Sequence, residues 1–544
     1  MWFYPEDVVL VKMPKDRSPS HCYSRLSIRL FQTLLMAIIM LQKVNGFFID
    51  GNLWYSDPDS LNRVTVLGSA SENPQHITIP RSVTYRAAES TIICAVTDIG
   101  ESAFENEITL KSVLLPSSLR HIGAWAFRGC SSLTKINIPN GVVVIGDTDA
   151  YYTKGAVFAG CTSLTNISIP PSVELITQSA FSGCPLECDT VTIPGLCMVD
   201  GWIIDTPVDF APKDGRLELP EGVKIADGTF CGCQGIKSVK LPKTLKRIPN
   251  FLFRECDNLT TVEFPEGIEE IGASSFSRCN LQSISLPRSV CLLDNYIFQE
   301  LPIEELVIPE RVEFLPERFC QDCHSLKKVI FKGDVFQIGP HAFENCPLLS
   351  AIVFMGNAPD KSQDFFLDLA FGFNEELNPV ERTVYVKRGS EGWDTEIPGR
   401  WHGMRIEYLE EAGVLTVNAS GGKKVPVPQL WIDGYPLIVT AAGGDVNAAI
   451  SANAANGRKV WECYVLGLDP EIATDDFKIT SFTLCPDGTL NQNSVKYTPA
   501  HDKWNIPGAA AVLQGAETLD GEWQTVTEAN KASLRFFKLA FQLP

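Results

Sequence analysis

A repeat of 22 or 23 residues constrains this chain more than any other feature. Its pattern is Leu-x-x-Ile-x-Ile-Pro-x-x-Val-x-x-Ile-Gly-x-x-Ala-Phe-x-x-Cys-x-x, and copies begin at Leu110, Leu133, Leu164, Ile236, Leu259, Leu281, Ile303 and Leu326. One such unit is too short to bury its own apolar face, so neighbouring units must stack. The 544 residues therefore do not divide into the three or four globular domains that length alone would suggest.

Each slot of the pattern has a structural role. Alternating Val113 and Leu115 predict a short strand with one face inward, and Pro116 ends it because proline lacks the N–H that a strand needs. A second short extended stretch follows. We expect Gly123 to let the chain bend with a positive φ, and Phe127 to place its ring inside the coil.

Departures from the pattern are local. Residues 147–155 insert into the second unit, and residues 188–216 hold a degenerate or inserted unit. Fragments at His76 and Ile99 form an irregular first rung, which an insertion around residues 85–95 divides. We place irregular or capping rungs at 47–109 and the regular array at 110–354.

The pattern resembles the BspA-like, or treponemal-type, leucine-rich repeats of bacterial and protist surface proteins, over about Ile77 to Phe354. The resemblance implies an α/β solenoid, a right-handed horseshoe with a parallel concave sheet. It also implies adhesion or protein–protein interaction at the cell surface, without catalysis.

Seventeen cysteines would suggest a disulfide framework or a reactive thiol, but their positions favour packing. Eight occupy the last conserved slot of the repeat: Cys130, Cys161, Cys184, Cys233, Cys256, Cys279, Cys323 and Cys346. Side chains in one column of a parallel stack lie about 4.7–4.9 Å apart, farther than disulfide geometry prefers. We expect buried free thiols. Zinc is the competing interpretation for Cys320-x-x-Cys323, although no histidine follows at a suitable spacing.

Outward positions of the last strands supply the candidate partner-binding residues. Val307, Ile330 and Val353 would lie side by side, next to Glu305 and Lys328. A contiguous apolar strip is unusual on a solvated face. Three explanations remain open: the chain's own C-terminal segment covers the strip, a partner protein binds it, or it reflects only the preference of exposed strands for β-branched residues.

The N-terminal region carries a secretory pattern. Leu30 to Leu41 is an apolar run preceded by Arg25 and Arg29, and Val44-Asn45-Gly46 supplies a cleavage site. The run is too short to cross a bilayer. We expect residues 1–46 to be a signal peptide, starting at Met1 or Met13, and the mature chain to be secreted and associated with the cell surface, with no transmembrane span. A buried core helix is the alternative.

Beyond Phe354 the repeat dissolves. Residues 355–411 look like the cap that ends BspA-like arrays, with a strand at Thr383 to Val386. Residues 412–544 predict a small, mainly-β domain, with strands near 477–484, 494–498, 508–513, 523–526 and 534–543, and a short helix or buried strand at 460–468. This segment resembles C-terminal modules of verrucomicrobial-type secreted repeat proteins, which implies at most attachment or sorting.

The net charge and the absence of known motifs argue against several classes of function. The net charge of −19 opposes binding to nucleic acid. The seven histidines lie in no known catalytic or metal-binding motif, and the sequence predicts no cofactor. Asp469, Asp475 and Asp476 form an acidic cluster that an enzyme in residues 413–544 would use. The leading hypothesis is a protein-binding surface protein; a structural stalk without a ligand and a C-terminal enzyme are the alternatives.

Overall fold

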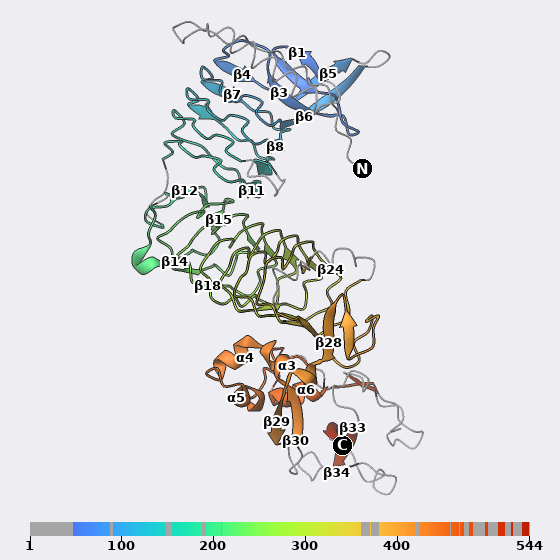
Figure 1. Ribbon diagram of the computed structural model, residues 1–544. Coiled ribbons are helices and arrows are strands. Elements are labelled where there is room, and N and C mark those ends of the chain that lie inside the picture. The colour runs from blue at the N-terminus through green and yellow to red at the C-terminus, as the bar shows by residue number, and fades with distance from the viewer. Residues whose placement is uncertain are drawn as a thin grey trace, which may run out of the picture.

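The structure is a computed structural model. It describes residues 47–86, 91–147, 155–187, 192–207, 209–360, 370–371, 380–418, 424–456, 458–466, 468–472, 478–481, 496–498, 510–516, 524–525 and 536–542. The expected signal peptide, residues 1–46, lies outside these ranges. Successive coils stack into a solenoid that begins at an N-terminal sheet and ends against a C-terminal unit (Figure 1).

The first strand of each coil builds what we call the first face. These strands pair in parallel and in register, so that Val113 lies beside Ile136 and Val329 beside Ile352. They form three sheets: β4 (His76–Thr78), β7 (Ser112–Leu114) and β9 (Lys135–Ile136); β14 (Arg216–Glu218), β16 (Ser238–Lys240) and β18 (Thr261–Glu263); and β21 (Glu305–Ile308), β23 (Lys328–Phe331), β25 (Ala351–Phe354), β26 (Thr383–Val386) and β28 (Met404–Tyr408), with β27 (Gly399–Trp401) antiparallel to β28.

The second strand of each coil builds the second face. Most of these strands have only two residues, and the second of the two points inward just before the following turn. They are β8 (His121–Ile122), β10 (Val144–Ile145) and β11 (Leu175–Ile176); β13 (Trp202–Asp205) and β15 (Lys224–Ile225); β17 (Arg247–Ile248), β19 (Glu270–Ile271) and β20 (Leu292–Leu293); and β22 (Phe314–Leu315) and β24 (Gln337–Ile338). In the degenerate unit, β12 (Cys197–Val199) forms a hairpin with β13.

The described residues from Ser112 to Phe354 hold a single helix, the 3-10 helix η1 (Lys213–Gly215). The solenoid is therefore mainly β. The α/β class predicted from the resemblance is not confirmed, because each coil uses a second short strand and tight turns where a helix would stand. The horseshoe with a concave sheet is not confirmed either.

The N-terminal sheet continues directly into the second face. Strands β1 (Phe47–Asp50), β2 (Leu53–Ser56) and β3 (Arg63–Ser69) precede β6 (Thr91–Ile99), which pairs with β8; β5 (Ser82–Arg86) pairs with β6 as a hairpin. Tyr55 and Val66 of this sheet are fully buried in the same core as Phe127. The sheet thus closes the N-terminal end of the described core.

Phenylalanine rings stack along the axis of the solenoid. Phe104, Phe127 and Phe158 lie 5.3 and 5.4 Å apart by ring centroids, and Phe230 and Phe253 lie 5.5 Å apart. The backbone N–H of each ring residue donates to a carbonyl of the next coil, as from Phe127 to Val157 at 2.9 Å. Apolar packing and hydrogen bonds therefore both join each coil to the next.

The turn before each ring requires an unusual backbone. The residue two positions earlier has a positive φ, as at Trp125 with φ 56° and Phe251 with φ 57°. Gly123, which we expected to adopt a positive φ, does not. A Cβ at Gly123 would stand 2.8 Å from the carbonyl oxygen of Ile99 in the preceding coil, so glycine is needed there for close approach.

Each of the eight cysteines of the repeat column is a free thiol. Seven are buried and Cys184 is half-buried. The Cys130 Sγ donates to the carbonyl oxygen of Phe104 at 3.1 Å, and the Cys256 Sγ to that of Phe230 at 3.1 Å. Burial raises the pKa of Cys130 to about 12. Cys320 and Cys323 are buried and free as well, whereas Cys197, outside the column, is disulfide-bonded.

The C-terminal unit, which we define as residues 413–472, is largely helical in its described part. Strands β29 (Val414–Asn418) and β30 (Lys424–Pro428) form a hairpin, followed by α3 (Gln429–Asp433), α4 (Pro436–Ala441), α5 (Val446–Ser451) and α6 (Val460–Leu466). The helix alternative for 460–468 is the one observed. Farther on, the predicted strands coincide with β31 (Lys478–Ser481), β32 (Lys496–Thr498), β33 (Ala510–Ala516), β34 (Gln524–Thr525) and β35 (Phe536–Gln542).

Candidate interaction surfaces

The predicted apolar strip lies on the first face, where β21, β23 and β25 pair in register. Ile330 and Val353 are only 1% and 0% exposed. They form one buried cluster with Leu409 of η3 (Leu409–Ala412) and Leu430 of α3, and Val307 packs at its edge. The chain's own C-terminal segment therefore covers the strip, so these side chains do not form the open partner-binding surface that their outward positions suggested.

Beside this cluster, Lys328 of the solenoid contacts the C-terminal unit. Its Nζ lies 2.6 Å from the Asp433 carboxylate of α3 and 2.9 Å from Glu305 on the neighbouring strand. Burial lowers the pKa of Lys328, but the two carboxylates outweigh burial and hold this pKa above its ordinary value. Lys328 is therefore a charged contact of the junction.

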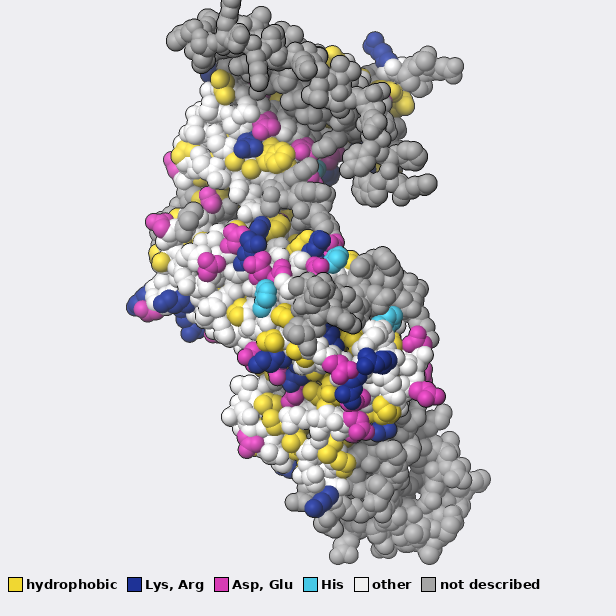
Figure 2. Space-filling model, viewed as in Figure 1, with side chains coloured by type: hydrophobic (Ala, Val, Ile, Leu, Met, Phe, Trp, Pro, Cys, Tyr) yellow, Lys and Arg dark blue, Asp and Glu magenta, His cyan; other side chains and the backbone are white. Residues whose placement is uncertain are grey.

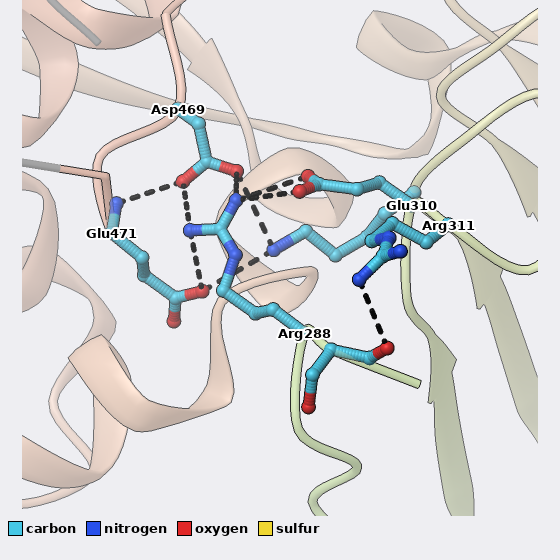
Figure 3. A network of polar contacts seen from close by, with 7 residues as sticks. Arg288, Glu310, Arg311, Asp469 and Glu471 are labelled. Atoms are coloured by element: carbon cyan, nitrogen blue, oxygen red, sulfur yellow. Dashed lines mark hydrogen bonds and ion pairs between the residues drawn. The ribbon is translucent and has the colours of Figure 1, made fainter. Parts of the chain in front are cut away.

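A second polar network lies at the same junction (Figure 3). Arg288 extends from the turn before β20 to Asp469 of the C-terminal unit at 2.7 Å, and it also binds both carboxylate oxygens of Glu310 at 3.0 Å. Lys332 lies 3.3 Å from Glu471 and 4.0 Å from the ring centroid of Tyr435. These charges are largely shielded, since Lys332 and Asp469 are 9% and 13% exposed.

Burial affects the acids of this network differently. The pKa of Glu471 is raised, mainly by burial, although Lys332 acts against the shift. The pKa of Arg288 is raised because Asp469 and Glu310 outweigh the effect of its burial. Asp469, the one described member of the predicted acidic cluster, is thus neutralised by cations of the solenoid and does not face an open carboxylate pair. Asp475 and Asp476 lie outside the described residues.

The second face carries a different sequence of side chains. In successive coils the residue before the second inward apolar residue is Lys224, Arg247, Glu270, Leu292, Phe314 and Gln337. Phe336 precedes Gln337, and its ring lies 5.5 Å from that of Phe314 by centroids. Leu292, Phe314 and Phe336 are 59%, 52% and 48% exposed. We call these three residues the second-face strip. Sequence reasoning missed it, although the slot that holds Leu292 and Phe314 would have revealed two of its three members.

Comparison with known proteins identifies the repeats. A family model described as the BspA type leucine-rich repeat region matches residues 84–198 and 223–350, in six copies. The chain carries BspA-type leucine-rich repeats. No curated protein matches the chain.

Several solved structures of leucine-rich repeat proteins match the chain. A leucine-rich repeat protein from Bacteroides ovatus is 22% identical, covers 66% of this chain and 99% of its own, and has a TM-score of 0.26. The leucine-rich repeat protein of T. pallidum is 24% identical over 43% of this chain and 89% of its own, with a TM-score of 0.25. A leucine-rich cell surface protein from Faecalibacterium prausnitzii is 22% identical over 61% and 100%, with a TM-score of 0.25.

A cavity of about 450 Å³ opens where the degenerate unit interrupts the regular BspA-type coils. Its polar groups already have partners: Asp200 accepts hydrogen bonds from Ser168 and from the Ile169 N–H, and Lys224 donates to the Val173 carbonyl at 2.8 Å. Lys224 also lies 5.2 Å from the ring centroid of Trp202. These contacts hold the hairpin unit against its neighbours.

Two features are absent from the described part of the chain, a group of metal ligands and a helix that could span a membrane. No group of three or more His, Cys, Asp or Glu side chains there is arranged to hold a metal ion. Within the same residues, no helix combines the length and apolar character needed to cross a bilayer. Charged side chains of both signs are interspersed over the face of the solenoid seen in Figure 2.

Proposed function

We propose that the chain is a non-catalytic, cell-surface scaffold whose BspA-type coils bind a protein. The observation that carries this proposal is the junction itself. The first face already holds a folded unit, through a buried apolar cluster around Ile330 and charged contacts at Lys328 and Arg288. An apolar centre with a charged margin is the usual anatomy of a protein–protein interface.

Rigidity supports the same function. One buried core extends from Ile193 to Ile406, and hydrogen bonds join consecutive coils on several sides. Side chains on either face are consequently held at fixed spacing. A ligand that contacts several coils then finds its binding groups already ordered, which lowers the entropic cost of binding.

The proposal includes location and organisation. The segment 1–46 would direct export, the BspA-type coils would stand at the cell surface, and residues 355–411 would cap them. Residues 412–544 would serve attachment or sorting, as their resemblance to the C-terminal modules of secreted repeat proteins implies. The stalk without a ligand remains the second candidate, because the stacked core would equally support a stiff spacer.

Two measurements test the proposal. Protease treatment of intact cells should degrade the chain if it is displayed outside, while a cytosolic marker survives. Purified full-length chain, immobilised and exposed to cell-surface and matrix proteins, should retain a partner whose binding saturates in titration with the purified partner. External display without any saturable partner would favour the stalk; protection from the protease would contradict surface display.

A further inference from the structure

The second-face strip is not required by the fold. The outward slot that holds Leu292 and Phe314 holds Lys224, Arg247 and Glu270 in earlier coils of the same solenoid. Arg247 pairs in register with Glu270, and Glu270 pairs in register with Leu292, so a charged side chain also fits the slot. Three large apolar side chains at consecutive coils therefore reflect something other than packing of the core.

The two rings of the strip lie side by side on neighbouring coils. The rings of Phe314 and Phe336 lie 5.5 Å apart by centroids, and the Phe336 N–H donates to the Glu313 carbonyl at 2.7 Å. With about half of each side chain exposed, the strip presents roughly 300 Å² of apolar surface. A patch of this size on a rigid face can supply the apolar centre of a protein contact.

Acidic residues border the strip. Glu269 and Glu270 lie on the coil before Leu292, and the exposed Glu313 directly precedes Phe314 on its own coil. The cations of the preceding coil are already engaged, since Lys246 lies 3.4 Å from Glu269 and Arg247 lies 2.6 Å from Glu270. Arg311 is the nearby cation, and it donates to the Ser289 carbonyl.

From this combination we infer that the second-face strip is a docking surface for a protein segment that presents apolar side chains flanked by lysine or arginine. The inference rests on the proposed function and assigns it a surface and a class of partner. The apolar groups would contact Leu292 and the two rings, and the basic groups would approach Glu313 and Glu269.

Charge favours an external basic partner over other occupants. A second copy would bring the same acids to the contact, and the chain as a whole carries −19. The neighbouring segment 361–379 contains Asp364, Asp368, Glu375 and Glu376 against the single Lys361, so it is acidic too. Both alternatives place like charges at the strip.

The test uses the full chain and two synthetic peptides of equal length with the same apolar residues, one with lysine and one with glutamate at every polar position. Fluorescence anisotropy measures binding to the wild type, to a Phe314→Ser/Phe336→Ser variant of unchanged charge, and to Leu114→Ser. Leu114 is 62% exposed on the first face and serves as the matched control. A third variant, Glu313→Lys, tests the contribution of the acidic border.

We expect the lysine peptide to bind the wild type and Leu114→Ser equally, and the double serine variant at least tenfold more weakly. Glu313→Lys should weaken the lysine peptide about threefold and favour the glutamate peptide. Equal binding of the lysine peptide to all variants would mean non-specific attraction to an acidic protein and would overturn the inference.

Two further outcomes would also overturn it. A wild-type dimer in solution that the double serine variant abolishes would make a second copy the occupant. A fall in Tm of more than about 5 °C in that variant would place part of the chain itself on the strip. If a partner captured by the wild type is retained by the double serine variant, the strip is refuted while the proposed function stands.

Discussion

The guanidinium of Arg288 and the carboxylate of Asp469 meet at 2.7 Å although 181 residues separate them in sequence. This contact fixes the C-terminal unit against the solenoid, together with the apolar cluster around Ile330 and Val353. The apolar strip of the first face is therefore covered within the chain, whereas the second-face strip is exposed.

Replacing Arg288 with alanine should loosen the C-terminal unit. Asp469 and Glu310 would lose a charged hydrogen-bond partner in a partly buried site, which costs about 1.5–3 kcal/mol. Hydrogen exchange of amides in α3 and α6 should accelerate about ten- to hundredfold. Arg311→Ala, which removes an exposed side chain from the next coil, is the control; equal exchange in both variants would show that Arg288 does not hold the junction.

The free energy of unfolding should decrease as the pH rises toward the pKa of Asp227. This carboxyl is 5% exposed, and burial raises its pKa from 3.8 to about 6, against the effect of Arg247 at 3.5 Å. Because the folded state holds the proton more tightly, its contribution is complete below the unfolded pKa and is lost as pH rises from about 4 to about 6. The loss is of the order of 3 kcal/mol.

Urea unfolding between pH 4 and pH 7.5 measures this effect, with Asp227→Asn as the matched variant. Asn250 donates to Asp227 from its backbone and side chain, so an amide at 227 keeps the hydrogen bond from the backbone. The difference in free energy of unfolding between wild type and variant should change over that pH window. A constant difference would show that Asp227 does not titrate with a raised pKa.

The seven buried cysteines of the column should not react with thiol reagents in the folded protein. Cys130 is completely buried with a pKa raised to about 12, so at pH 8 its reactive thiolate is scarce and inaccessible. Cys291, half-buried on the second face, should be labelled by a maleimide under the same conditions. Mass spectrometry of peptides distinguishes them, and rapid native labelling of Cys130 would contradict a packed column.

Replacing a phenylalanine of the stack should lower the free energy of unfolding far more than replacing a phenylalanine of the second-face strip. Phe253 is fully buried and stacks on Phe230 and Phe276 at 5.5 and 5.8 Å, so Phe253→Ala should cost about 3–5 kcal/mol. Phe314→Ala removes a half-exposed ring and should cost under about 1 kcal/mol. Thermal or urea unfolding measures both; similar losses would mean that the strip also packs against the chain.

Most of the coil structure could be predicted from the repeat pattern, because the apolar slots of the pattern are the positions that become buried. Inward slots such as Val113, Phe127 and Cys130 recur at each coil, and their roles need no information beyond the coil itself. Gly123 shows where this reasoning stops. The sequence marks that position as special, but a steric contact with the preceding coil cannot be distinguished from a positive φ without coordinates.

The cover on Ile330 and Val353 could not be predicted because it depends on contacts over long sequence separations. The apolar strip was visible in the sequence, but Leu430 comes 100 residues after Ile330 and carries no repeat signal. The helices α4 and α5 were similarly obscured, since their short Ala-rich and Gly-rich segments give weak periodicity, whereas a helix at 460–468 was one of two alternatives.

The hydrogen bonds between consecutive coils, such as that from Phe127 to Val157 at 2.9 Å, run along the axis of the solenoid. A pull along that axis, as between an anchored cell and a moving ligand, loads the bonds of the end coil before those of its neighbours. The array would then yield one coil at a time, and each released unit of 22 or 23 residues adds about 70 Å of contour length. Stacking by short, similar steps would thus let the solenoid lengthen one coil at a time under such a force, instead of losing its fold in a single step.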